Sequence, residues 1–293
     1  MKIAHFLAAV LMIGVFGLNY SVIKLGLNSF DPLLLAGLRF SLCAFPIIFF
    51  IKKPICHFKY VALYGIFEGL GLWSVLLGLH AGLSAGISAL DLQFGAFMTS
   101  VVGVFIFKDK ITKFNICGFI FSLAGLGLIA TITDGSVTRC GMIFALLGAA
   151  FWVAANTALK KSGTNQPFKF IIWSSPISAF LIFSIRLITR EGGSLQYRYF
   201  DLSSILALLF TAYVTALFAY SIWAMLLSKY RLTISAPAYL LVPISSMGFS
   251  HLIFNEPIGT IKIIAAMLIV SGVLINTCGR GLAEFINSRA VLP

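Results

Sequence analysis

Long apolar runs separated by short polar segments make up most of the chain. They cover roughly residues 5–26, 32–51, 60–80, 84–107, 112–131, 139–160, 168–188, 202–227, 234–254 and 259–278. Each run is close to the ~20 residues that a helix needs to cross a hydrocarbon core of ~30 Å. Segments of alternating polarity, which membrane barrels require, are missing from the sequence. The pattern therefore predicts an all-α membrane protein with ten transmembrane helices.

The fourth and fifth apolar runs return in altered form as the ninth and tenth. Residues 85–131 align with 232–278 without a gap, and the alignment pairs Phe107 with Phe254, Asp109 with Glu256 and Gly125 with Gly272. An internal repeat of this kind decides the architecture before any local feature does. We predict two repeats of five helices, the first over residues 1–134 and the second over 135–293, which ends in a short cytoplasmic tail.

Composition supports the membrane class and excludes several functions. Hydrophobic residues make up 60% of the chain, charged residues 10%, and the mean hydropathy is +1.02, unlike an ordinary soluble domain. The net charge of +12 comes from short basic clusters between apolar runs, so we expect no nucleic-acid partner. The sequence holds no GxSxG, HExxH or P-loop pattern, and its five cysteines have no metal-ligand spacing. We therefore expect no enzyme, no metal and no other cofactor.

The distribution of Lys and Arg predicts the orientation in the membrane. If the N-terminus is cytoplasmic, the inner loops and tails carry fourteen of these residues and the outer loops six. This bias indicates that both termini are cytoplasmic. Because five helices per repeat is an odd number, the second repeat enters the membrane from the opposite side. Such inverted repeats are typical of secondary transporters, whose substrate sites lie near the bilayer midplane between the repeats.

Several short motifs point to one family. They are FGLNY at residues 16–20 with Lys24 after it, PLLLAGLRF at 32–40, WVAAN at 152–156 with Lys160 at the same interval, and NEP at 255–257. Over essentially its whole length the chain resembles the drug/metabolite transporter superfamily, EamA type. Within that family it is most similar to exporters of amino-acid metabolites of the O-acetylserine and cysteine kind, through LNYSVIKLGL, LLLAGLRFSL, LDLQFGAF and YLLVPI.

The resemblance implies a secondary transporter that exports small amino acids or their metabolites across the bacterial inner membrane by alternating access. It implies that the first four helices of each repeat line a central cavity and that the fifth packs at the edge. The expected partners are a small-molecule substrate, the lipid bilayer and a proton as candidate coupling ion, with the chain acting as a monomer or homodimer. Two acids depart from the family pattern, Glu68 and Asp91. They leave open an alternative, uptake or exchange of a cationic or nucleotide-like metabolite.

Those two acids are the leading candidates for substrate binding or coupling, because an ionisable group within a span usually faces a cavity or a partner. Arg39 lies at a depth similar to that of Asp91, and the two residues could form a structural ion pair. No cation is expected at the depth of Glu68, so we predict that this carboxyl binds substrate or a proton. A merely packed, protonated carboxyl is the alternative.

Further candidates for the site are polar and aromatic residues within the spans. Gln93 stands at the family's polar position, and the others are Asn19, Asn156, Trp152 and Tyr239. Helix-to-helix hydrogen bonding is the alternative for Asn19 and Asn156, and a lipid-facing or packing role is the alternative for the aromatic rings. Pro237 and Pro243 lie six residues apart in the ninth run. Since each lacks a backbone N–H and disturbs a helix, we predict hinges there.

Overall fold

The computed structural model describes residues 3–90, 113–132, 137–189, 201–222 and 241–272, together with 94, 95, 98, 102, 135, 274 and 275. Helices account for the regular structure of these residues, and no strand occurs among them. Four of the predicted site residues lie outside the described residues: Asp91, Gln93, Pro237 and Tyr239.

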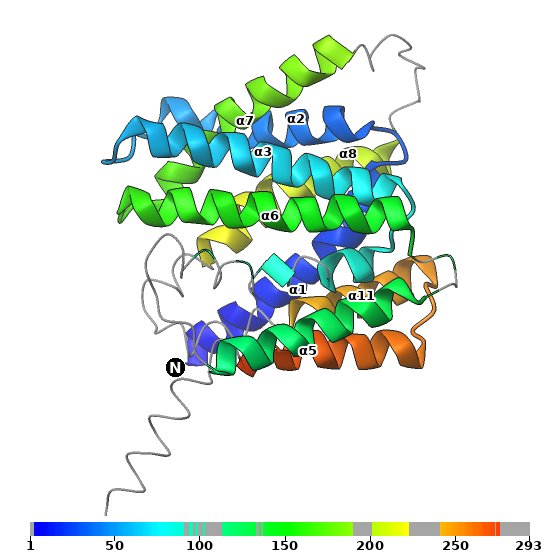
Figure 1. The fold of residues 1–293 in the computed structure, drawn as a ribbon. Helices are drawn as coiled ribbons and strands as arrows, with labels where there is room; N and C mark the ends of the chain where they lie inside the picture. The colour runs from blue at the N-terminus through cyan, green and yellow to red at the C-terminus, as the bar shows by residue number, and fades with distance from the viewer. Residues whose placement is uncertain are drawn as a thin grey trace, which may run out of the picture.

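The elements follow the apolar runs closely (Figure 1). They are α1 (Ile3–Gly26), α2 (Pro32–Ala44), the 3₁₀ turn η1 (Ile47–Phe49), α3 (Phe58–His80), α5 (Lys113–Ala130), α6 (Arg139–Ser162), α7 (Pro167–Thr189), α8 (Leu202–Leu209), the π-helix η2 (Phe210–Ala219) and α11 (Val242–Phe254). Residues 85–90 and Thr260–Gly272 are also helical.

Six helical segments among the described residues are long and apolar enough to cross a membrane: Leu7–Gly26, Pro32–Phe49, Phe58–His80, Arg139–Ser162, Pro167–Thr189 and Leu202–Ile222. Three shorter apolar helices accompany them: Ile116–Ile129, Val242–Phe254 and Thr260–Gly272. Large apolar side chains such as Phe180, Leu187 and Met267 are exposed on the outside of the bundle, as lipid-facing residues are. The all-helical membrane class is confirmed, and the count of ten helices stays a prediction.

Polar residues and proline determine where the described helices begin and end. Asp31, Thr138 and Asp201 cap the N-termini of α2, α6 and α8 by accepting a hydrogen bond from a backbone N–H three residues later. The second apolar run was predicted to continue to residue 51. Instead α2 ends at Ala44, because Pro46 has no N–H to donate and the chain continues as the 3₁₀ turn η1.

Contacts between neighbouring helices reveal their relative directions. Gly71 of α3 lies against Gly148 of α6, and Gly78 lies against Gly141, so these two helices are antiparallel. By contrast, α1 and α11 run parallel, because Gly17 lies against Ser245 while Lys24, farther along α1, reaches Glu256 just beyond α11. The end of α1 therefore lies at the same end of the bundle as the end of α11 (Figure 1).

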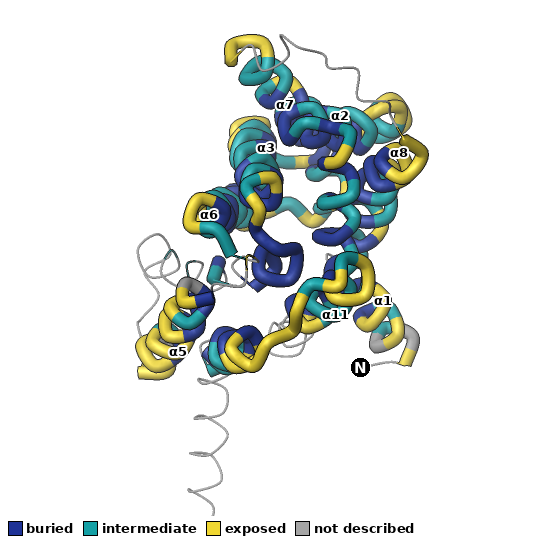
Figure 2. Tube along the Cα trace, turned by 90° about the vertical axis from the view of Figure 1, so that its right-hand side faces the viewer, coloured by how far each residue is buried: buried dark blue, intermediate teal, exposed yellow. Residues whose placement is uncertain are grey.

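The helices α5 and Thr260–Gly272 pack together at the lower edge of the bundle in both views (Figures 1 and 2). A Cβ on Gly125 would lie 2.6 Å from Cγ1 of Ile269, and a Cβ on Gly272 would lie 2.5 Å from Oγ of Ser122. The repeat alignment that pairs Gly125 with Gly272 also pairs Ser122 with Ile269. These two contacts are therefore equivalent, and they require the helices to run antiparallel.

Candidate functional site

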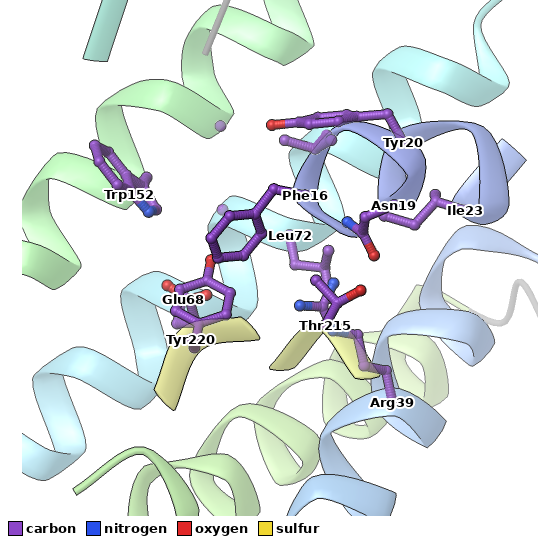
Figure 3. A pocket seen from close by; sticks show the side chains of 13 residues that line it. Phe16, Asn19, Tyr20, Ile23, Arg39, Glu68, Leu72, Trp152, Thr215 and Tyr220 are labelled. Carbon is purple, nitrogen blue, oxygen red and sulfur yellow. The ribbon is translucent and has the colours of Figure 1, made fainter. Parts of the chain in front are cut away.

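A central cavity lies among helices α1, α2, α3, α6 and η2 (Figure 3). The volume open to the centres of water-sized molecules in this cavity is about 60 Å³. Since one water needs roughly 10–15 Å³ by this measure, the space accepts a small ligand. The lining residues are Phe16, Asn19, Tyr20, Ile23, Arg39, Glu68, Gly71, Leu72, Val75, Gly148, Trp152, Thr215 and Tyr220. Neither α5 nor Thr260–Gly272 contributes to this lining.

The π-helix η2 places two of these residues on one face. Tyr220 directly follows η2, and its backbone N–H donates to the carbonyl of Thr215, five residues earlier, so the two residues lie on the same side of the helix. In an α-helix the same two residues would be separated by about 140° around the axis. The wider helix therefore brings a hydroxyl and a phenol to the cavity together. Such π-helical segments are frequent at functional sites.

Arg39 and Glu68 bring opposite charges to the cavity. The Arg39 side chain comes from α2 and is only 6% exposed, whereas Glu68 comes from α3 and is half-buried. The two residues interact electrostatically, but no direct ion pair joins them. The prediction that Glu68 has no cation at matching depth is therefore wrong, because packing of α2 against α3 brings Arg39 to the same cavity.

Three of the lining residues each hold a buried polar atom without a hydrogen-bond partner among the described residues. These atoms are Oδ1 of Asn19, Nε of Arg39 and Oγ1 of Thr215. A buried polar group left without a partner costs about 1–3 kcal/mol, so each such group calls for an explanation. Their gathering around one cavity indicates a site that a polar ligand or water completes.

Aromatic rings form much of the remaining wall. Phe16 of α1 and Tyr220 meet edge to face, with ring centroids 5.1 Å apart and planes at 84°. Figure 3 shows Trp152, on α6, to the left of Phe16 and Tyr220. Leu72 and Val75 of α3 add aliphatic surface. The cavity thus combines one charged pair with a wall suited to an apolar side chain.

A second, smaller cavity shares Arg39, Glu68 and Tyr220 with the first. It holds about 20 Å³ by the same measure, room for a single water, and includes Ser174 and Ser175 of α7. The three shared side chains therefore separate two compartments. The charged pair stands at the junction between the aromatic wall of one and the serines of the other.

The structure brings together three of the residues predicted from sequence, Asn19, Glu68 and Trp152. Asn156 is not part of the lining, and its Nδ2 donates to the carbonyl of Trp152 at 2.8 Å within α6. Pro243 lies in the first turn of α11 as described, where a missing N–H is tolerated. No group of three or more potential metal ligands occurs in the described part of the chain.

A separate polar cluster lies where α1 and α11 end. Nζ of Lys24 is 2.6 Å from Oε1 of Glu256 and 4.6 Å from the ring centroid of Phe254. Ser250 donates to the other oxygen of Glu256, and Lys262 donates to the carbonyl of Pro257 at 2.8 Å. This Lys24–Glu256 cluster connects the first half of the chain to the second at one end of the bundle.

Two matches to a known family divide the chain as the internal repeat does. The EamA-like transporter family matches residues 3–131 and again residues 139–278. The chain belongs to the EamA-like transporter family. The two-repeat architecture is thereby confirmed, while the exact boundary at residues 134 and 135 and the inverted orientation remain predictions. Members of this family are transporters, so the expectation that the chain is no enzyme is also confirmed.

Relatives of this EamA-family chain include two named proteins. This chain is 32% identical over 280 residues to a probable amino-acid metabolite efflux pump of Salmonella typhimurium, and the match covers 92% of this chain and 94% of the relative. It is 33% identical over 282 residues to a protein of the same description from Escherichia coli, with the same coverage. The resemblance drawn from the sequence motifs is confirmed by these matches.

One solved structure, described only as a crystal structure of a protein, has the same fold. It superposes with a TM-score of 0.59 over 94% of this chain and 98% of its own, at 14% identity. This match concerns the fold alone. The superposition covers nearly the whole length of both chains.

Proposed function

We propose that this EamA-family transporter is a secondary transporter that exports small amino acids or amino-acid metabolites by alternating access. The observation that carries the proposal is the identity of about one third, over nine tenths of the chain, with two probable amino-acid metabolite efflux pumps. The small central cavity supports it, since its lining offers one cation, one anion and an apolar wall.

The alternative of a cationic or nucleotide-like substrate fits this lining less well. A cation would meet the charge of Arg39, and a phosphate-bearing nucleotide would meet that of Glu68. The cavity is also small for a nucleotide. The observed charges therefore favour a ligand that carries both signs.

The proposed location is the bacterial inner membrane, with both termini cytoplasmic. The described basic residues support this orientation because they divide between the two ends of the bundle. Lys24, Arg139, Arg186 and Lys262 lie toward the end that holds the Lys24–Glu256 cluster, whereas Lys52, Lys53, Lys59, Lys160, Lys161 and Lys169 lie at the opposite helix ends. A cytoplasmic face rich in Lys and Arg is the usual arrangement.

The test is transport by purified protein in proteoliposomes. Labelled L-cysteine, kept reduced, should accumulate against its gradient when a pH gradient is imposed, and small amino acids should compete. Liposomes without protein give the background. If no amino-acid-like compound is transported or competes, the proposed substrate class is wrong.

A further inference from the structure

The central cavity holds two side chains of opposite charge, the buried Arg39 and the half-buried Glu68, that form no direct ion pair with each other. Arg39 and Glu68 both line it, yet they form no ion pair. Buried charges are normally paired, because an uncompensated charge in a low-dielectric interior is unfavourable. A space between two such charges is complementary to a molecule that carries one charge of each sign at its ends.

We propose that Arg39 and Glu68 form a clamp for the zwitterionic end of an α-amino acid, with Arg39 binding the carboxylate and Glu68 the ammonium. This inference rests on the proposed function and specifies its substrate class. A guanidinium presents several N–H donors to a carboxylate, and an ammonium donates to carboxylate oxygens. Both bonds are charge-assisted and hence stronger than neutral ones.

The polar atoms without partners fit the same ligand. Nε of Arg39 and the hydroxyl of Thr215 can donate to the carboxylate, and Oδ1 of Asn19 can accept from the ammonium. A bound zwitterion would therefore satisfy donors and acceptors that the described residues leave unsatisfied. The ligand would also be neutral overall, so the site would keep its balance of charge when occupied.

The residues that line the cavity indicate which groups of the ligand the site would require. Leu72, Val75 and Trp152 lie around the same cavity and offer apolar surface to a short side chain. Arg39 and Glu68 are the sole charged residues of this lining as the structure describes it. We therefore expect the α-amino and α-carboxylate groups to be obligatory, and the side chain to be limited chiefly by size.

The experiment is equilibrium exchange of labelled L-cysteine in proteoliposomes under reducing conditions, with three unlabelled competitors. L-Cysteine methyl ester lacks the carboxylate charge, cysteamine lacks the carboxylate altogether, and N-acetyl-L-cysteine lacks the ammonium. Wild-type protein should prefer L-cysteine to each analogue by roughly tenfold or more, as the loss of a charge-assisted hydrogen bond implies. Exchange needs no ion gradient, so the result does not depend on coupling.

The variants should lose discrimination selectively. Arg39→Gln should abolish the preference for L-cysteine over the methyl ester and cysteamine but keep the preference over N-acetyl-L-cysteine. Glu68→Gln should abolish the preference over N-acetyl-L-cysteine but keep the other two. Arg139→Gln, which removes an exposed arginine at the start of α6, is the matched control and should leave every ratio unchanged. If Arg39→Gln fails to fold, Arg39→Lys replaces it, and a weakened preference over the methyl ester is then expected.

Two kinds of failure are distinguishable. If wild-type protein exchanges L-cysteine but does not discriminate against the analogues, or if the variants change all ratios equally, the clamp is wrong and the proposed function stands. If wild-type protein exchanges neither L-cysteine nor any other small amino acid, the proposed function is wrong and the clamp is rejected with it.

Discussion

The side chain of Asp201 caps the N-terminus of α8 and makes further hydrogen bonds there. Its Oδ1 accepts from the backbone N–H of Ser204 at 3.2 Å and from the hydroxyl of Ser29 at 2.7 Å, and Ser203 donates to Oδ2. The hydrogen bonds from Ser203, Ser204 and Ser29 lower the pKa of the Asp201 carboxyl. The same residue therefore caps α8 and ties it to the segment that follows α1.

This lowered pKa predicts a pH dependence of stability. The ionised carboxylate stabilises the folded state fully above the unfolded pKa of about 3.9, and this contribution is lost as the pH falls from there toward the lower folded pKa. Asp201→Asn keeps a capping oxygen but no charge. We expect the thermal unfolding midpoint of wild-type protein to be higher than that of this variant at pH 7. The difference between the two midpoints should shrink below pH ~4.

Thermal unfolding in detergent across this pH range measures the effect. Asp201→Ala, which removes the cap as well, should be less stable than Asp201→Asn at every pH. A difference between wild type and Asp201→Asn that stays constant down to pH ~3 would contradict an ionic contribution, since Asp201 would then act by hydrogen bonding alone.

At the residue scale, Asn19, Glu68 and Trp152, which the sequence suggests as site residues, all line the cavity, whereas Arg39 is predicted from sequence only as the structural ion-pair partner of Asp91. Depth along a helix can be counted from sequence, whereas the direction of a side chain around the axis and the identity of the facing helix cannot. Thr215 was not selected because its position beside Tyr220 depends on the π-helix η2. Nothing in the apolar sequence of that run signals π-helical hydrogen bonding.

Among the elements, the pairing of α5 with Thr260–Gly272 depends on glycine at two equivalent positions. Methyl groups added there would collide with the partner helix, at 2.6 Å from Ile269 in one case and 2.5 Å from Ser122 in the other. Small residues at helix contacts let backbones approach closely in membranes, where van der Waals packing supplies much of the association energy.

We therefore expect Gly125→Ala and Gly272→Ala to destabilise the protein by about 1–3 kcal/mol, the usual cost of overpacking. Gly127→Ala is the matched control on the same helix, because a Cβ there meets no atom within 4 Å. The measurement is the thermal midpoint and the yield of monodisperse protein in detergent. Equal effects at Gly125 and Gly127 would show that helix propensity, rather than the packed contact, dominates.

At the scale of the whole molecule, the Lys24–Glu256 cluster joins the two repeats. Lys24 lies in the first family match and Glu256 in the second, so their ion pair holds the corresponding ends of α1 and α11 together. Both side chains are partly buried. Removing one partner of such a pair leaves the other charge without compensation, at a cost that can reach several kcal/mol in a buried site.

A charge exchange tests this connection. Lys24→Glu and Glu256→Lys alone should each lower the exchange rate roughly tenfold by placing like charges together, whereas the double variant should recover most of the activity. The readout is equilibrium exchange normalised to folded protein. A double variant no more active than either single one would argue against a direct role of the pair.

The orientation of the whole chain makes a separate prediction. In a background without the native cysteines, of which Cys117 and Cys140 are exposed, a cysteine introduced by Asp134→Cys should react with an impermeant reagent added outside intact cells. One introduced by Lys161→Cys should not. Labelling of the second and not the first would reverse the predicted topology.

The sequence by itself determined the membrane class, the approximate extent of the helices that the structure describes, the internal repeat and the family. Each of these is recorded in local hydrophobicity, in spacing along the chain or in short motifs. Only the tertiary structure decided that Arg39 and Glu68 face one cavity, that Thr215 joins them, and that Lys24 meets Glu256 across the repeats. The physical reason is that these relations depend on how helices rotate and pack against one another, and a nearly uniform apolar sequence leaves those rotations undetermined.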